Sequence, residues 1–312
     1  MTTAAGEITA RKRLGDRVFS TSTIVAGSVI LAVLAAVAIF LVAQSIPALI
    51  AKPGSLPNAA PNFWVYVWPL VFGTVWAAAI ALIIATPVSI GVALFISHYA
   101  PRRIAQLLGY IIDLLAAVPS VVFGLWGIQV LAPAVQPFYA WLNEHAAWIP
   151  FFGGDVSGTG RTILTVAIVL AVMVLPIMTA VCREVFLQTP KLHEEAALAL
   201  GATRWEMIRV AVLPFGRPGI ISAAMLGLGR ALGETMAVAM VLSPAAVVSF
   251  LLLTSQNPNT IAANIALQFA EASGVGVNTL IASGLVLFVI TFIVNAIARY
   301  AVNRRKAFSG AN

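Results

Sequence analysis

Two oppositely charged residues, Arg230 and Glu234, lie inside one of the long apolar runs of the sequence. Arg230 is 11 residues beyond Gly219, where this run begins. At about 1.5 Å per residue, a helix would place Arg230 about 17 Å into a hydrocarbon core about 30 Å thick. A charge at that depth costs at least about 2.5–3.5 kcal/mol on insertion scales, so an ionisable residue there indicates function. The spacing of four residues predicts that both side chains share one face of a continuous helix.

Such a pair suits the passage of an anion through a membrane. The planar fork of N–H donors on Arg230 fits an oxyanion, and Glu234 keeps the site near neutral, so that the anion is not trapped. Hydrogen phosphate carries a proton that it can donate to Glu234, whereas sulfate is fully ionised and cannot. The alternative is a buried ion pair that only holds helices together. We predict that Arg230 and Glu234 lie on a substrate pathway.

Other residues that could carry chemistry are sparse. The histidines His98, His145 and His193 are scattered over span ends and loops, and no two of them have the spacing of metal ligands. The single cysteine, Cys182, excludes an intramolecular disulfide and is typical of a small buried apolar residue. For Asp113, a pathway role and a helix-capping or snorkelling role remain equally open. We predict no catalytic and no metal-binding residue.

The elements that must position the charged pair are membrane-spanning helices. The chain of 312 residues is 61% hydrophobic and 9% charged, whereas a soluble globular domain is about 25% charged. Apolar runs of about 20 residues are typical of helices, because barrel strands alternate over segments of about 10 residues. The sequence therefore predicts an all-α polytopic membrane protein with six transmembrane helices. Their approximate ranges are 24–46, 68–96, 105–131, 163–185, 219–242 and 279–300.

Prolines and shorter apolar runs modify this pattern. Pro119 interrupts the third span, and Pro87 predicts a kink in the second. The aromatic-rich stretch 132–160 predicts a short helix lying at the membrane interface. The run 245–253 is too short to cross a membrane and predicts a re-entrant or interfacial segment. A short amphipathic helix is expected within 259–271.

Basic residues give the orientation of the spans. The formal net charge is +7, but the basic residues lie at span ends and are not interleaved with aromatic residues, which argues against nucleic acid as a partner. With the N-terminus inside, only Lys52 and Arg161 of the 18 Lys and Arg residues fall outside, and Arg230 falls within a span. The positive-inside rule therefore predicts that both termini are cytoplasmic.

This topology divides the chain into segments. Residues 1–20 are expected to form a cytoplasmic N-terminal segment, and residues 21–66 the first transmembrane helix with an extracytoplasmic loop. Residues 67–303 are expected to form the main transmembrane domain, which includes a cytoplasmic loop at 188–218. Residues 304–312 are expected to form a cytoplasmic tail.

The 188–218 loop carries dense charge between two apolar runs. Its composition predicts a helix over 192–200, rich in Glu, Ala and Leu, which Gly201 ends. A second helix is expected over 203–212, with a threonine as its first residue to cap it and Leu213-Pro214 to end it. The loop is therefore predicted to form a helix–glycine–helix segment on the membrane face.

This loop resembles the EAA loop of ABC-importer permeases, which docks onto a cytoplasmic ATPase. The resemblance rests on Glu195-Ala196-Ala197, followed after three residues by Gly201 and later by Leu213-Pro214. Ala211 stands where the family usually has an aliphatic residue, often Ile. An ordinary cytoplasmic loop with helical propensity is the alternative. The resemblance implies that five residues take part in ATPase coupling: Glu194, Glu195, Ala196, Ala197 and Gly201.

The stretch around the charged pair extends the resemblance. Gly229 to Val238 is similar to the fifth-helix signature of permease subunits of the phosphate ABC importer, the PstC type in particular. The stretches 13–19 and 118–127 agree with the same type, so the resemblance covers about residues 11 to 305. It implies the type I ABC importer permease fold and a role of the charged pair in phosphate passage.

The resemblance also implies an assembly in a bacterial plasma (inner) membrane. This multi-pass chain would form a heterodimer with a second permease subunit of the PstA type, surrounded by membrane lipid. Two cytoplasmic ATPase subunits and an extracytoplasmic phosphate-binding protein would join it. The sequence has no Gly-x-x-x-x-Gly-Lys-Ser/Thr motif, so ATP and Mg²⁺ would bind to the partner ATPase. This chain would need no cofactor of its own and would be a transporter subunit, not an enzyme.

The predicted function is that of a transmembrane permease subunit of an ATP-driven importer that moves inorganic phosphate into the cell. A permease for another oxyanion, sulfate or molybdate, is one alternative, and the Arg–Glu pair argues modestly against it. An ion-gradient-driven secondary transporter is another, which would leave the EAA-like loop unexplained. A membrane-bound enzyme is a third, and no cluster of His, Cys, Asp or Glu supports it.

Overall fold

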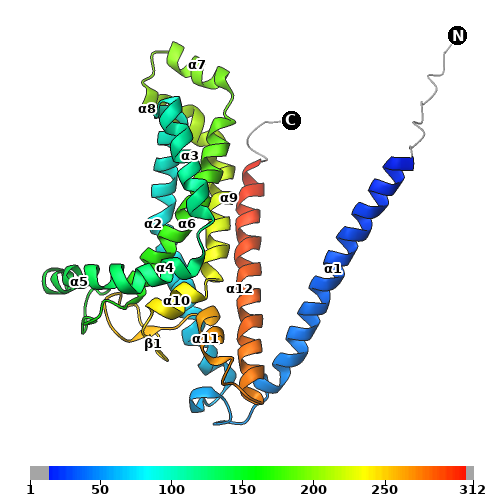
Figure 1. Ribbon diagram of the computed structural model, residues 1–312, viewed down its shortest axis with the longest axis vertical. Helices are drawn as coiled ribbons and strands as arrows, with labels where there is room; N and C mark the ends of the chain where they lie inside the picture. The colour runs from blue at the N-terminus through cyan, green and yellow to red at the C-terminus, as the bar shows by residue number, and fades with distance from the viewer. Residues whose placement is uncertain (1–13, 307–312) are drawn as a thin grey trace.

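Residues 14–306 are described in a computed structural model of the protein (Figure 1). The expected cytoplasmic segments 1–20 and 304–312 lie mostly outside these residues. Six helices of the described part are long and apolar enough to cross a membrane. They confirm an all-α protein with six transmembrane helices. Their ranges are Leu14–Leu49, Phe63–Tyr99, Ser120–Ala146, Ile163–Leu187, Arg204–Leu232 and Val275–Tyr300.

Long helices run side by side and form the body of the molecule (Figure 1). Helix α6 (Ile163–Leu187) is the most buried and packs against α2 (Phe63–Leu94) and α9 (Leu213–Leu232). Small buried residues on α2, such as Ala81 and Ala85, let the helices approach closely. Helix α12 (Val275–Lys306) stands beside α9.

Helix α1 (Leu14–Leu49) leans away from this body and meets α12 only near its own C-terminal end (Figure 1). There, the side-chain amide of Asn278 donates a hydrogen bond of 2.8 Å to the carbonyl of Gln44. Ala48 is buried at the same joint, whereas most of α1 exposes apolar side chains. A helix that is apolar all round requires an apolar environment, which a membrane supplies.

The third span differs from the sequence expectation, which placed one interrupted helix over 105–131. Helix α3 (Arg102–Ala116) ends before Pro119, and α4 (Ser120–Trp126) continues through a π turn into α5 (Ala132–Ala146). In Figure 1, α4 and α5 run across the direction of α2 and α6. Proline disfavours helical geometry at the residue before it, so the chain changes direction at this point. The helix expected within 132–160 is present as α5.

At the end of the body opposite α7 (Lys191–Ala199), short helices and loops connect the spans (Figure 1). The expected re-entrant segment 245–253 is irregular and begins with β1 (Pro244–Ala245), which pairs in parallel with β2 (Asn257–Pro258). The short helix expected within 259–271 is α11 (Ile261–Gln268), and the hydroxyl of Thr260 caps its first turn.

Candidate functional site

The fifth span breaks between the two charged residues that its sequence singled out. Helix α9 ends at Leu232, and α10 (Met236–Val241) begins after a gap of irregular backbone. The expectation of one helix over 219–242, with both charges on a shared face, is therefore wrong. Gly233 has a low helix propensity, and the buried carboxylate of Glu234 offers the backbone a competing hydrogen bond.

Glu234 is 8% exposed and caps the start of α10. The backbone N–H of Ala237 donates a hydrogen bond of 3.1 Å to Oε1 of this carboxylate. The partial positive charge at a helix N-terminus also favours a negative group there. Within residues 14–306, the structure gives the second carboxylate oxygen no hydrogen bond. That oxygen can accept a hydrogen bond from a donor group of a ligand.

Arg161 holds the opposite end of α10. Its guanidinium donates three hydrogen bonds of 3.1–3.2 Å to the backbone carbonyls of residues 240–242. A cation at a helix C-terminus complements the helix dipole, so opposite charges fix both ends of this short helix. Sequence reasoning counted Arg161 only as a basic residue outside the membrane. No local pattern links it to residues 80 positions away.

Arg230, in the last turn of α9, is half-buried and lacks a protein partner for part of its guanidinium. Its Nε is buried and finds no hydrogen-bond acceptor in the part of the chain that the structure describes. No ion pair joins Arg230 to Glu234, so the structure of this described segment does not contain the buried ion pair considered as the alternative. A buried N–H without an acceptor is costly, and an anion that reached it would relieve this cost.

The helix–glycine–helix segment of the 188–218 loop is present. Helix α7 covers the first predicted helix, and Gly201 ends it with a φ of +85°. The N–H of Gly201 bonds to the carbonyl of Leu198 at 3.0 Å, and the N–H of Ala202 bonds to that of Ala197 at 3.2 Å. This pattern is a Schellman motif, whose left-handed residue favours glycine. The prediction that Gly201 ends the helix is confirmed.

The second helix starts as predicted but does not end as predicted. Thr203 and Glu206 form a capping box, in which each side chain accepts a hydrogen bond from the other residue's backbone N–H. Helix α8 (Arg204–Met207) then continues through the π turn Ile208–Val212 into α9. The π turn opens the hydrogen-bond ladder just before Pro214, so this proline does not end the helix.

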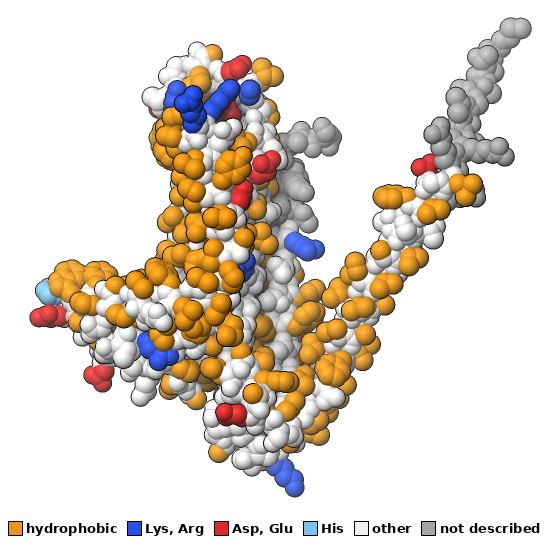
Figure 2. Space-filling model, in the orientation of Figure 1, with side chains coloured by type: hydrophobic (Ala, Val, Ile, Leu, Met, Phe, Trp, Pro, Cys, Tyr) orange, Lys and Arg blue, Asp and Glu red, His pale blue; other side chains and the backbone are white. Residues whose placement is uncertain are grey.

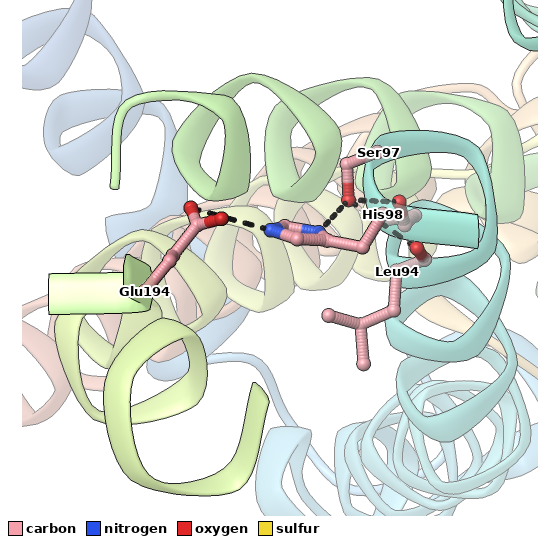
Figure 3. Close-up of polar contacts among 5 residues, drawn as sticks. Leu94, Ser97, His98 and Glu194 are labelled. Carbon is pink, nitrogen blue, oxygen red and sulfur yellow. Dashed lines mark hydrogen bonds and ion pairs between the residues drawn. The ribbon is translucent and has the colours of Figure 1, made fainter. Parts of the chain in front are cut away.

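Glu194 ties α7 to the end of α2. One of its carboxylate oxygens lies 3.6 Å from Nε2 of His98, and Nδ1 of His98 lies 2.7 Å from Oγ of Ser97 (Figure 3). The Ser97 hydroxyl donates to the carbonyl of Ala93, so it accepts from Nδ1 of the ring. When His98 is protonated, both ring nitrogens donate, one to Ser97 and one to Glu194. Sequence reasoning treated His98 as an isolated histidine and missed this contact.

The predicted coupling residues divide into two faces. Glu194 and Ala197 are half-buried, and Ala197 packs against a buried cluster that includes Phe186. Glu195 and Ala196 are exposed. Large apolar side chains are exposed on the same loop, which is the composition expected of a protein-binding patch. They are Leu192 at 76%, Leu198 at 43%, Leu200 at 90% and Trp205 at 56%.

Comparison with known proteins gives three findings. Residues 85–307 match the family described as binding-protein-dependent transport system inner membrane component. A phosphate transport system permease protein PstC 2 of Mycobacterium tuberculosis is 45% identical over 297 residues, which cover 92% of this chain and 91% of the relative. A phosphate transport system permease protein PstC of Mesorhizobium japonicum is 39% identical over 313 residues, covering 96% and 94%.

A solved structure agrees with the fold. A chain of a bacterial ABC transporter involved in the import of the acidic polysaccharide alginate aligns with a TM-score of 0.62 and 16% identity, over 92% of this chain and 96% of that one. The fold is that of ABC importer permeases, and the resemblance of the chain to PstC-type permeases is confirmed. This chain belongs to the family of binding-protein-dependent transport system inner membrane components, and it is a transporter subunit rather than an enzyme.

Proposed function

We propose that this chain is the permease subunit of an ATP-driven importer that moves inorganic phosphate into a bacterial cell. The observation that carries this proposal is the break in the fifth span. There, among residues 14–306, the Nε–H of the half-buried Arg230 has no acceptor, and one carboxylate oxygen of Glu234 has no hydrogen bond. The substrate class is supported by the relatives, which carry the name of phosphate transport permeases.

The two side chains complement hydrogen phosphate in different ways. Arg230 donates hydrogen bonds to the phosphate oxygens, and the second carboxylate oxygen of Glu234 accepts a hydrogen bond from the P–OH group. Sulfate has no such proton at neutral pH, so it would place an oxygen against the carboxylate without a hydrogen bond. Buried polar groups left unpaired in this way discriminate strongly between similar substrates.

The energy for transport comes from partner subunits. The exposed face of α7, with Glu195 and Ala196 among exposed leucines, docks onto a cytoplasmic ATPase. Two such ATPase subunits bind ATP and Mg²⁺, and this chain holds no cofactor of its own. A second permease subunit of the PstA type completes the pathway, and an extracytoplasmic phosphate-binding protein delivers the substrate.

The chain lies in the bacterial inner membrane with both termini in the cytoplasm. Two observations and the positive-inside rule support this orientation. The Leu14 end of α1 and the Lys306 end of α12 point toward the end of the molecule that carries α7 (Figure 1). Lys and Arg side chains gather over that end (Figure 2). Basic residues near span ends favour the cytoplasmic side.

The test is uptake of labelled phosphate into cells that lack this gene and are complemented with the wild type, Arg230→Ala or Glu195→Lys. Sulfate is added as a competitor, and the amount of each variant in the membrane is measured. We expect sulfate-insensitive uptake with the wild type and loss of uptake with both variants. Sulfate-sensitive uptake would favour another oxyanion as the substrate. Transport by the purified chain alone in liposomes would favour an ion-gradient-driven transporter.

A further inference from the structure

A second polar site lies at the end of the molecule where α7 is found, on a different part of the chain from Arg230. It is an open cavity of about 600 Å³, formed where α3 and α6 meet the start of α7. Three basic side chains line it, Arg102, Arg183 and Lys191, and its wall contains one acidic side chain, Asp113. The charged groups around the cavity therefore leave an excess of two positive charges.

The basic residues of this cavity have no acidic partners. Within residues 14–306, no carboxylate lies in an ion pair with Arg102, Arg183 or Lys191. The Nε of Arg183 is buried and has no hydrogen-bond acceptor. Neighbouring cations repel one another, and a buried donor without an acceptor costs free energy, so a bound anion would offset both costs.

Two helix N-termini add to the positive potential. Helix α3 begins with Arg102 after Pro101, and α7 begins with Lys191 after Pro190. Neither proline caps its helix with a side-chain hydrogen bond. The first N–H groups of both helices therefore have no side-chain cap among the described residues, and such N–H groups bind oxyanions favourably. The first turn of α3 also lines the cavity through Ala105.

The guanidinium of Arg183 occupies the space next to Gly109, where a side chain would otherwise lie. A methyl group at position 109 would overlap Nη1 of Arg183, so the guanidinium would have to move from its present position against α3. Gly109 is buried and lines the same cavity. In the wall of the cavity, Arg183 of α6 therefore packs against Gly109 of α3.

We propose that this cavity binds a phosphate group. Arginine supplies a bidentate donor fork, the helix N-termini supply backbone N–H groups, and Asp113 can accept the proton of a monoprotonated phosphate. Two sources share this chemistry. One is free phosphate released after transport, a case that rests on the proposed function. The other is the headgroup of an anionic phospholipid, whose chains could lie along the exposed apolar side chains of α3, such as Leu114.

The experiment uses the purified complex of this chain with its partner subunits, in an Arg230→Ala background, so that the pathway site does not contribute. One arm measures binding of labelled inorganic phosphate by equilibrium dialysis in lipid-free detergent. The other measures retention of phosphatidylglycerol against phosphatidylcholine by native mass spectrometry in phosphate-free buffer. The variants are Arg183→Gln and Gly109→Ala. Their controls are Arg204→Gln, an exposed arginine outside the cavity, and Gly91→Ala, where an added methyl meets nothing within 4 Å.

We expect Arg183→Gln to weaken binding by about tenfold or more, because it removes a charged donor. Gly109→Ala should weaken binding less, because it only displaces the end of the Arg183 side chain, and both controls should bind as the parent does. A loss confined to inorganic phosphate identifies the free ion, a loss confined to phosphatidylglycerol identifies the lipid, and a loss of both shows that the cavity accepts either. Unchanged binding of both ligands overturns the proposal, as does an equal loss in Arg204→Gln. The binding assay does not depend on transport, so failure of the proposed import function would not produce either result.

Discussion

Gly201 and Gly233 each lie where a helix ends, but the polar groups near the two glycines differ in their hydrogen bonding. At Gly201, the Schellman motif pairs the backbone, and Thr203 and Glu206 satisfy each other's N–H groups. At Gly233, Glu234 caps the following helix with one oxygen only, and Nε of Arg230 stays unpaired. The first break is a joint completed by local hydrogen bonds. The second leaves polar groups that a ligand can satisfy.

Glu194 and Glu195, which are adjacent in the 188–218 loop, also differ in their surroundings. Glu194 reaches His98 at the end of α2, and its side chain is 24% exposed. Glu195 is exposed beside apolar side chains that the described residues leave uncovered. Two glutamates adjacent in sequence therefore have different physical roles. One holds α7 to the membrane body, and the other is available to a partner.

The largest expected effect is at the break in the fifth span. Arg230→Ala should lower the initial rate of phosphate uptake by about 10–100-fold, because a charged hydrogen bond to the substrate is lost. Arg230→Lys should keep part of the rate, since it keeps the charge but not the planar fork. Arg299→Ala, at an exposed arginine of α12, serves as the control. Normal uptake by Arg230→Ala would remove this residue from the pathway.

The next effect concerns selectivity at Glu234. Glu234→Gln keeps an oxygen that can accept from the N–H of Ala237, so α10 stays capped, but it loses the charged acceptor for the P–OH group. We expect phosphate uptake to fall by about tenfold and sulfate to become a competitor. Labelled sulfate transport measures this change. Complete rejection of sulfate by Glu234→Gln would contradict the proposed discrimination.

The two loop glutamates give a matched pair. Glu195→Lys reverses an exposed charge on the proposed docking face, and we expect ATP-driven uptake to fall by about tenfold, since reversing a charge at an interface weakens docking. Glu194→Gln removes a partly exposed ion pair worth about 0–1 kcal/mol, so uptake should fall only a few-fold. ATPase activity of the assembled complex, with and without loaded binding protein, measures both. Equal effects would contradict the separate roles assigned to Glu194, which holds α7, and Glu195, which contacts a partner.

The smallest effect concerns the glycines themselves. Gly201→Ala should destabilise the end of α7 by about 1–2 kcal/mol, because its φ of +85° is strained for residues with a side chain. An added methyl there meets nothing within 4 Å, so no clash contributes. Gly233 has a φ of −93°, and Gly233→Ala should cause no such loss. Hydrogen exchange of the amides around each turn measures the difference, and similar protection changes at both sites would contradict it.

The sequence by itself determined the features that depend on near neighbours. Apolar runs identified the spans, and the length of a helix needed to cross a membrane explains why. The cap at Thr203 and the stop at Gly201 were also predictable, because their hydrogen bonds join residues three to five positions apart. The charges at 230 and 234 could be recognised from their apolar surroundings alone.

Only the tertiary structure decided how these elements are used. The break at Gly233 depends on Glu234 becoming buried where it can cap α10, and Arg161 reaches the other end of that helix from a distant part of the chain. The contact between His98 and Glu194 and the cavity around Arg183 likewise join segments that are far apart in sequence. Helix packing sets such distances, and no local periodicity encodes them.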